Sequence, residues 1–274
     1  MEVAKETLAI IERESIRLPL VGRRFTEAVA GCLDGTHFYP PEELERIRHQ
    51  IIATAGGWTG TIEVANETTL AGVARLLADG EQPVAALNFA SAKNPGGGFL
   101  NGSQAQEESL ARSSALYPSL LRARPFYDRH RASPSLLYSD AMILSPACPV
   151  FRDDDGSLVE HPYRVTFITS AAPNAGAAAT NRPAEIPLIP EVFRRRSEYV
   201  LALAVAAGCP RLVLGAWGCG VFRNDPQTVA SAFAEHLQRG GWAYRFERIV
   251  FSVWDTSPSR ETFSAFRSAL APDG

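Results

Sequence analysis

The stretch LNFASAKNPGGGFLNGSQAQEE, residues 87–108, decides the fold and places the candidate site. It begins within an apolar segment, Pro83–Ala90, that predicts a buried strand. Three consecutive glycines, Gly96–Gly98, follow and allow the backbone to approach a ligand closely. A helix is then predicted over Gln106–Tyr117, with two carboxylates in its first turn. A strand, a glycine loop and an acidic helix start together indicate a site for a phosphorylated sugar with a general acid beside it.

On both sides of this stretch, predicted strands alternate with predicted helices. Four further strands are predicted over Thr61–Ala65, Arg164–Ser170, Arg211–Ala216 and Glu247–Trp254. Helices are predicted over Glu2–Glu14, Glu42–Ile52, Thr68–Ala78, Glu191–Ala207, Gln227–Arg239 and Ser259–Leu270. We also expect extended chain over Ser135–Leu144 and a hairpin within Val150–Tyr163, turning at Asp153–Gly156.

This alternation is typical of a layered α/β fold with a largely parallel or mixed sheet. No change of composition marks a linker, and there is no internal repeat or low-complexity segment. We therefore expect a single domain over residues 1–274, with an N-terminal helical extension over 1–60 and an α/β core over 61–274.

Composition narrows the classes of function. With 274 residues, 46% of them hydrophobic, the chain can bury a substantial core, and its formal net charge of −3 does not predict binding to duplex nucleic acid. No apolar run is long enough to cross a membrane, and the N-terminus does not have the pattern of a signal peptide. The four cysteines lack metal-binding or CxxC spacing, so we expect free thiols and a cytoplasmic location.

A second glycine loop, Gly218-Cys219-Gly220-Val221-Phe222, also follows a predicted strand and precedes a predicted helix. Open α/β sheets bind ligands at the carboxyl ends of their strands, so the two loops are expected to share one edge of the sheet. Together they can offer backbone N–H groups to the two phosphates of a diphosphate without a lysine. Each loop alone is also compatible with an ordinary tight turn. Neither matches the Walker or dinucleotide-binding pattern.

Glu107 and Glu108 are adjacent, so on a helix their side chains diverge by about 100°. They cannot form the facing pair of an ordinary retaining glycosidase, whose carboxyl groups lie about 5–5.5 Å apart. We expect one of them to act as the general acid and the other to orient the sugar. A helix N-terminus favours ionised carboxylates, so burial, the neighbouring charge and a bound diphosphate would have to raise the pKa of the acid. Two Glu residues can also occur in the first turn of a helix only because they interact favourably with the helix dipole.

The spacing GGG-x7-QEE resembles the signature of the poly(ADP-ribose) glycohydrolases, and the full phrase over residues 87–108 resembles their bacterial-type branch. The loop GAWGCGVFRNDP is similar to the diphosphate loop of that branch and to the phosphate loop of macrodomains. The segments ETLAIIE and TIEVANETTL also look like this family, so the resemblance covers nearly the whole chain. It implies a macrodomain-like three-layer α/β/α sandwich around a mixed sheet.

The resemblance also implies roles for individual residues. Glu108 would be the catalytic acid and Glu107 the residue that fixes the ribose beside the scissile bond. The other residues implied to bind substrate are Asn94, Gly96, Gly97, Gly98, Gln106, Gly218, Cys219, Gly220, Val221 and Phe222, with the Phe222 ring against the ADP-ribose. No residues of the adenine pocket can be assigned from these motifs.

The implied reaction is hydrolysis of the 1″→2′ ribose–ribose bonds of poly(ADP-ribose), releasing ADP-ribose, without metal or cofactor. It would reverse ADP-ribosylation, including that of the DNA damage response. The expected partners are poly(ADP-ribose) and ADP-ribosylated proteins, and we expect a monomer. Two alternatives stay open: a non-catalytic reader of ADP-ribose, and an enzyme that removes single ADP-ribose groups from proteins. The carboxylate pair favours an enzyme over a reader.

Other polar clusters are expected to be structural. The five histidines are scattered and none has ligand spacing with an acid or a cysteine. The basic run from Arg122 to Arg131 could track a polyanion but is also typical of a solvated helix face. Arg194–Arg196 is predicted to be exposed, and Asp153–Asp155 is predicted to form a turn instead of a metal site.

Overall fold

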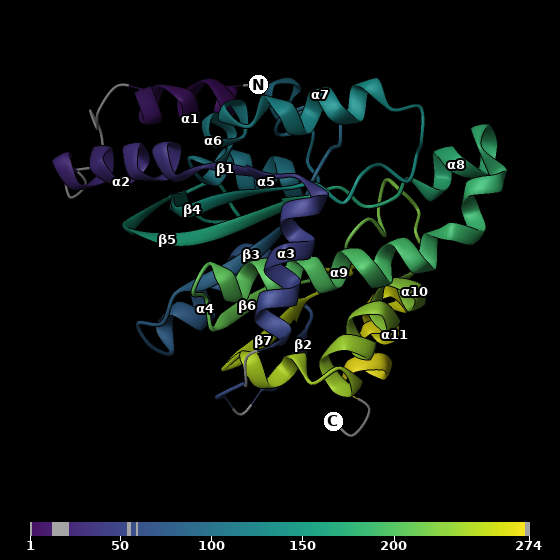
Figure 1. Ribbon diagram of the computed structural model, residues 1–274. Helices are drawn as coiled ribbons and strands as arrows, with labels where there is room; N and C mark the ends of the chain where they lie inside the picture. Colours follow the sequence, from purple (N-terminus) through teal and green to yellow (C-terminus); the bar gives the residue numbers. More distant parts are fainter. Residues whose placement is uncertain (1, 13–21, 54–55, 59, 272–274) are drawn as a thin grey trace.

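A seven-stranded mixed sheet runs through the centre of the molecule in the order β1-β4-β5-β3-β6-β7-β2. The computed structural model describes residues 2–12, 22–53, 56–58 and 60–271 (Figure 1). The strands are β1 (His37–Tyr39), β2 (Thr61–Ala65), β3 (Val84–Phe89), β4 (Met142–Arg152), β5 (Leu158–Ser170), β6 (Arg211–Leu214) and β7 (Arg248–Ser252). The pairs β5–β3, β3–β6, β6–β7 and β7–β2 are parallel, whereas β4 pairs antiparallel with both β5 and β1.

Helices cover both faces of this sheet. The α-helices are α1 (Glu2–Glu12), α2 (Gly22–Gly35), α3 (Pro41–Ile52), α4 (Thr69–Ala78), α5 (Gln106–Ser113), α6 (Leu116–Arg122), α7 (Arg124–Ala132), α8 (Ala175–Asn181), α9 (Ile189–Ala206), α10 (Pro226–Ala234) and α11 (Glu261–Leu270). Short helical turns are η1 (Phe99–Asn101), η2 (Pro183–Leu188), η3 (Glu235–Arg239) and η4 (Trp242–Arg245).

Side-chain alternation along the strands divides the core into two halves. On β3, Ala85 and Leu87 belong to the cluster shared with α9 and α10, whereas Val84 and Ala86 belong to the cluster shared with α4 and α7. A strand buried on both faces reads as the continuous apolar run seen in the sequence. The predicted three-layer α/β/α sandwich with a mixed sheet is therefore confirmed.

The predicted helix over Gln106–Tyr117 is broken in the middle. Ser114 adopts an extended conformation, and its hydroxyl donates to the Leu110 carbonyl at 2.6 Å and accepts from the Leu116 N–H at 3.2 Å. These bonds compete with the helical ones, a common effect of serine near its own backbone. Ser114 also forms an isolated bridge to Val150 of β4. The result is a short α5 that carries the two glutamates, followed by α6 on a new axis.

The N-terminal segment contributes more than helices. His37–Tyr39 pair with Met142–Leu144 and add β1 to the edge of the sheet, which the sequence did not indicate. α2 was also missed, and the last two residues predicted for the first helix, 13 and 14, lie outside the described residues. The other predicted strands and helices are present with shifted ends, and the predicted hairpin is longer because β4 begins at Met142. Of the segment Ser135–Leu144, expected to be extended, only Met142–Leu144 belong to a strand, and Tyr138 has a left-handed backbone with φ of +58°.

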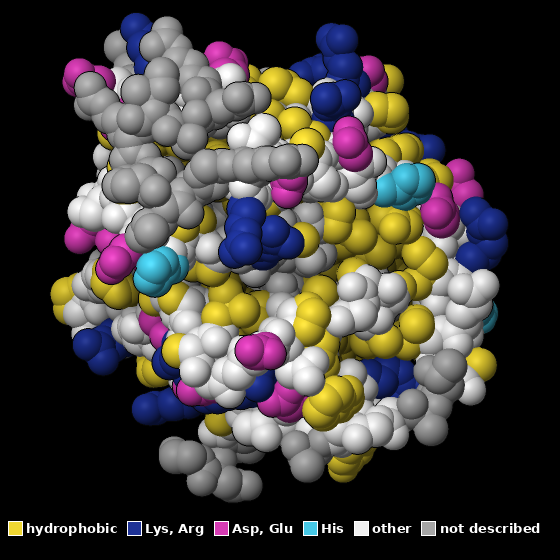
Figure 2. Space-filling view, turned by 90° about the vertical axis from the view of Figure 1, so that its left-hand side faces the viewer, with side chains coloured by type: hydrophobic (Ala, Val, Ile, Leu, Met, Phe, Trp, Pro, Cys, Tyr) yellow, Lys and Arg dark blue, Asp and Glu magenta, His cyan; other side chains and the backbone are white. Residues whose placement is uncertain are grey.

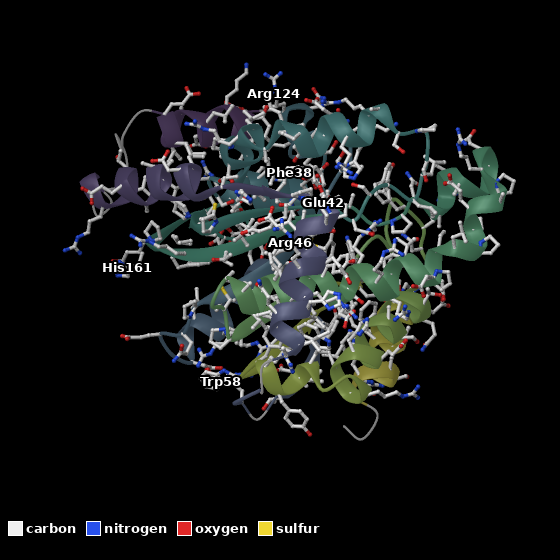
Figure 3. All side chains as sticks on the ribbon, in the orientation of Figure 1. Phe38, Glu42, Arg46, Trp58, Arg124 and His161 are labelled. Atoms are coloured by element: carbon white, nitrogen blue, oxygen red, sulfur yellow. The ribbon has the colours of Figure 1, made fainter. Side chains whose placement is uncertain are left out.

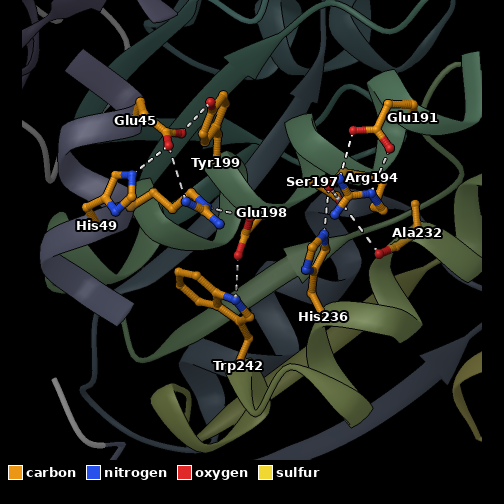
Figure 4. A network of polar contacts seen from close by, with 11 residues as sticks. Glu45, His49, Glu191, Arg194, Ser197, Glu198, Tyr199, Ala232, His236 and Trp242 are labelled. Atoms are coloured by element: carbon orange, nitrogen blue, oxygen red, sulfur yellow. Dashed lines mark hydrogen bonds and ion pairs between the residues drawn. The ribbon is translucent and has the colours of Figure 1, made fainter. Parts of the chain in front are cut away.

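A polar network fastens α3 to α9 (Figure 4). The Glu198 carboxylate is 8% exposed and accepts from Arg48 Nε at 2.6 Å and from Trp242 Nε1 at 3.3 Å. Beside it, the Tyr199 hydroxyl donates to Glu45 at 2.6 Å. Glu198 thus ties together three segments that are far apart in the sequence.

Of the run Arg194–Arg196, predicted to be exposed, Arg196 is fully buried. Its guanidinium donates to Asp140 at 3.0 Å, to the Ala171 carbonyl at 2.6 Å and to the Leu137 carbonyl at 3.1 Å. A buried arginine is tolerated only with such partners. The basic run on α6 and α7 is split in a similar way, because His130 is buried against Ser139 while its neighbours Arg129 and Arg131 are exposed.

The described surface carries charges of both signs. On the face shown in Figure 2, Lys and Arg side chains form small separate groups interspersed with acidic and hydrophobic ones. Figure 3 places Glu42 and Arg46 on α3, Arg124 at the start of α7 and His161 near the outer end of the β4–β5 hairpin. None of the helices in the described ranges is long and apolar enough to cross a membrane.

We expect Glu198→Ala to lower the free energy of unfolding by about 1–3 kcal/mol, because it leaves the buried Trp242 N–H without an acceptor and removes the partner of Arg48 Nε, so that the Arg48 guanidinium keeps only Glu45. Urea titration followed by circular dichroism measures the change. Glu160→Ala, at a carboxylate that is 80% exposed, is the control and should change stability by less than about 0.5 kcal/mol. Equal stability of the two variants would contradict the anchoring role of Glu198.

Candidate active site

The site begins at a side-chain clamp between α5 and β3. The Gln106 amide oxygen accepts from the Phe89 N–H at 2.9 Å, and its nitrogen donates to the Leu87 carbonyl at 2.8 Å. The same nitrogen donates to the Thr69 hydroxyl at the start of α4, at 3.1 Å. The hydrogen bonds of the Gln106 amide therefore position the helix that carries the two glutamates.

The Glu107 carboxylate lies over the end of β3 and is 3% exposed. One oxygen accepts from the Ser91 N–H at 2.7 Å and the other from the Asn88 amide at 3.3 Å. Burial raises the pKa of Glu107 from its ordinary 4.5 to about 8, an effect that the two donors oppose and the charge of Glu108 reinforces. Glu107 is thus a carboxyl group that can hold a proton near neutral pH.

The Glu108 carboxylate turns the other way, toward the glycine loop. It accepts from the Gly98 N–H at 2.8 Å and from the Ala105 N–H at 3.1 Å, and the residue is 8% exposed. The two carboxylates share no hydrogen-bond donor, so each is held by its own part of the backbone. Gly97 lies between them with φ of +59°, and a Cβ there would collide with Glu108 and come within 3.2 Å of Glu107.

The first glycine loop uses its N–H groups differently from the sequence expectation. The Gly98 N–H is taken by Glu108, and the Gly97 N–H donates to the Asn94 carbonyl at 2.9 Å. The Gly96 N–H also faces Glu107, whose ionised form it favours. The N–H groups of this loop therefore stabilise its own turn and bind the two carboxylates, instead of facing a ligand. The exposed Asn94 side chain lines the cleft and has no hydrogen bond within the described residues.

The second loop is rigid at its base and open at its tip. Gly218, with φ of +75°, packs against Ala172, and the Asn224 amide donates to the Gly218 carbonyl at 2.9 Å and to the Pro173 carbonyl at 2.8 Å. Among the described residues, no acceptor takes the N–H groups of Gly218, Gly220, Val221 and Phe222. Four unused backbone donors on one loop form a ready site for an anion.

Side chains of the second loop differ in their surroundings. Burial raises the pKa of the Cys219 thiol to about 12, so it stays protonated, and the Cys219 N–H is used within the turn at 3.1 Å from the Ala216 carbonyl. Val221 is 81% exposed. Phe222 is half-buried, with its ring centroid 6.2 Å from that of Tyr138.

A single cleft of about 1310 Å³ joins these parts at the carboxyl ends of the strands. All the residues proposed from the sequence line it except Gly96, which lies beneath Tyr117. The volume exceeds that of an ordinary small-molecule pocket and suits an elongated ligand. Among the described residues, no group of three or more His, Cys, Asp and Glu side chains could hold a metal ion.

Sequence reasoning missed several residues of this site. Asn88 and Asn224 act from beneath it on Glu107 and on the second loop, and Trp254, which is 64% exposed, lines the cleft at the end of β7. Their signals were available but weak. Asn88 is a polar residue inside an apolar strand, and Trp254 is the last residue of the final predicted strand.

Comparisons with known proteins point to one family. The family described as "Microbial-type PARG, catalytic domain" matches residues 4–153. Among curated proteins, none matches the chain. The structure is similar to that of poly(ADP-ribose) glycohydrolase (PARG) from Thermomonospora curvata, with 48% identity, 98% of each chain covered and a TM-score of 0.91.

Two similar structures contain ligands. The Thermomonospora curvata enzyme bound to the inhibitor ADP-HPD is 47% identical, with 97% of each chain covered and a TM-score of 0.87. The PARG of Deinococcus radiodurans in complex with ADP-ribose is 45% identical, with a TM-score of 0.83, over 93% of this chain and 98% of that one.

We expect Glu107→Gln to remove a pH dependence of stability. A carboxyl whose folded pKa is raised stabilises the fold most below its unfolded pKa, and this contribution is lost as the pH rises from about 4.5 to about 8. The free energy of unfolding of the native protein should therefore fall relative to the variant across that window, by about 1.4 kcal/mol per pKa unit at most. Urea titrations at several pH values measure the difference. A difference that stays constant with pH would mean that Glu107 is ionised throughout.

Proposed function

The chain belongs to the microbial-type PARG family and is a poly(ADP-ribose) glycohydrolase; from this premise, we propose how its residues bind and cleave the polymer. The observation that carries the proposal is the pairing of two buried, divergent carboxylates with a loop of four unused N–H donors. The loop suits a diphosphate, and the carboxylates suit a ribose at a glycosidic bond.

We assign the diphosphate to the second loop. Gly218, Gly220, Val221 and Phe222 would donate their N–H groups to phosphate oxygens, and a Cβ at Gly220 would meet nothing within 4 Å, so the ligand has room to approach. The first glycine loop would instead approach the ribose, with Gly97 bare between the carboxylates. Asn94, whose side chain is free, would contact the same ribose.

Glu107 would anchor the terminal ribose and Glu108 would act on the bond. Glu108 protonates the departing 2′-oxygen as positive charge develops on the sugar, and then takes a proton from the attacking water. The negative diphosphate stabilises that charge from the neighbouring loop. Because burial lets Glu107 hold a proton, it can donate to a ribose oxygen as well as accept from a hydroxyl. Gln106, with its amide engaged by β3, would position both.

The β7 end of the cleft would take the adenosine of the terminal unit. In the sheet, β6 lies between β3 and β7, so a ligand with its ribose at Glu107 and its diphosphate over the second loop extends toward β7. Trp254 and Asp255 line the cleft there. An exposed indole offers a flat face to a base.

The two alternative functions make weaker use of this geometry. A reader of ADP-ribose needs the diphosphate loop but gains nothing from burying two neighbouring carboxylates at the ribose. A hydrolase for single protein-linked ADP-ribose groups would share the same terminal-unit site, and comparing polymer with mono-modified protein as substrates separates it. We infer further that the enzyme is cytoplasmic and monomeric and acts on ADP-ribosylated proteins that carry the polymer.

We expect Glu108→Gln to reduce kcat for poly(ADP-ribose) by about 10²–10⁴-fold while leaving the Kd for ADP-ribose within a few-fold, because the amide keeps the shape and loses the transferable proton. Product release from purified polymer and calorimetry with ADP-ribose measure the two effects. Retention of more than about a tenth of the native activity would remove Glu108 as the acid, and failure of the native protein to cleave polymer at all would remove the proposed function.

We expect Phe222→Ala to weaken ADP-ribose binding by about 1–3 kcal/mol, the value of an aromatic contact with its buried area. The ring also packs beside Tyr138 and the core, so a melting curve on the same variant is the control. If the melting temperature falls sharply and the affinity stays the same, Phe222 packs the loop and does not cover the ligand.

A further inference from the structure

The cleft continues past the two glutamates, away from the diphosphate loop. In the sheet, β6 and β7 lie on one side of β3, and β5 and β4 on the other. α5 packs on β3, β4 and η1, so its later residues lead away from β6. A terminal unit that reaches from Glu107 over the β6 loop to β7 leaves this opposite end for whatever lies beyond the scissile bond.

Arg112 occupies that end. It lies one helical turn after Glu108 on α5, so the two side chains share a face of the helix. Within the described ranges, it is the only Lys or Arg among the residues that line the cleft, whereas six carboxylates line it: Glu67, Glu107, Glu108, Asp154, Asp155 and Asp255. A polyanion entering this end therefore meets a single positive side chain.

The guanidinium is held in place by the protein. Nη1 donates to the Ser103 carbonyl at 2.6 Å, and Nη2 donates to the Ser109 hydroxyl at 2.9 Å. A guanidinium has five N–H groups, so further donors remain after these two bonds. Partial burial lowers the pKa of Arg112 while the Glu108 carboxylate opposes that effect, and an arginine stays charged in any case. A fixed, half-buried fork of this kind suits a phosphate.

The N-terminal helix α1 packs against α5, the helix that carries Arg112. The Thr7 hydroxyl of α1 is buried and donates to the backbone carbonyl of Arg112 at 2.8 Å. Ala4 of α1 packs in one cluster with Phe99 of η1 and Ala111 of α5. Arg112 therefore stands on a helix that is braced on the side opposite the sheet.

We propose that Arg112, which lines the cleft together with Leu100 and Gln104, forms a leaving-group subsite that binds a phosphate of the ADP-ribose unit beyond the scissile bond. The proposal rests on the proposed function. It gives the enzyme a physical reason to prefer polymer, because a protein side chain as the leaving group carries no phosphate for Arg112. The subsite acts on specificity, whereas Glu107 and Glu108 act on the bond itself.

The test uses two substrates that differ only in the leaving group. One is the dimer of ADP-ribose, and the other is its counterpart in which the leaving group is adenosine without phosphates. Arg112→Gln should lower kcat/KM for the dimer by about 10–100-fold, as expected for a lost charge-assisted hydrogen bond. For the adenosine counterpart the loss should be at least about tenfold smaller, and the Kd for ADP-ribose should stay within about twofold.

Two further variants separate charge from structure. Arg112→Lys keeps the charge and loses the fork to Ser103 and Ser109, so it should recover part of the activity on the dimer. Arg46→Gln, at an arginine on α3, removes a charge outside the cleft and should leave both substrates unaffected.

Equal losses on both substrates, or weaker binding of ADP-ribose, would show that Arg112 holds the loop at Ser103. Either result would overturn the subsite and leave the proposed function intact. A native protein that cleaves neither substrate would overturn the proposed function, and the subsite with it. A selective loss on the dimer with partial rescue by lysine supports the subsite.

Discussion

The hydrogen bonds between the Gln106 amide and the backbone of β3 are the constraint on which the site depends. β3 is the central strand of the seven-stranded sheet and is buried on both faces, so its end is among the most rigid points of the fold. By matching one donor and one acceptor of that strand, Gln106 fixes where α5 begins and in which direction it runs. The two next residues are then placed without any freedom of their own, one over the strand and one over the loop.

This arrangement explains how a carboxylate can be buried beside another carboxylate. Burial of an ionised group is costly unless it is compensated, and here each glutamate has two hydrogen-bond donors. For Glu107 the donors do not fully offset burial, and its pKa stays high. Groups with strongly shifted pKa values are common in active sites, and a protonated Glu107 can donate a hydrogen bond to the substrate. The free-energy cost of burying Glu107 is offset by the stability of the rest of the sheet.

Much of the fold could be predicted from local sequence. The apolar strands and the helix predicted from Thr68 were visible because their signals are local, and the Thr68 side chain caps that helix by accepting from the Ala71 N–H at 3.1 Å. The short strand β1 could not be predicted, because three residues at an edge are defined by their partner strand and not by their own pattern. The break at Ser114 depends on a bridge to Val150, which is equally invisible along the chain.

The sequence predicted which residues form the site better than it predicted the role of each one. The motif around residues 94–108 indicated which side chains meet, and they do meet in one cleft. It did not indicate that the N–H groups of Gly97 and Gly98 are already used within the protein, because hydrogen bonding depends on three-dimensional geometry. Asn88 and Arg112 were missed for a related reason. One lies beneath the site and the other beyond it, and only the fold brings them to it.

The second loop also has a thermodynamic consequence. Its base is clamped by Asn224, yet the apolar side chain of Val221 at its tip is 81% exposed, and Trp254, which lines the same cleft, is 64% exposed. The free protein thus keeps hydrated apolar surface in a fixed place. A ligand that covers both side chains removes this surface from water without first having to order the loop. Association should then carry a negative change in heat capacity, so that its enthalpy becomes more favourable as temperature rises.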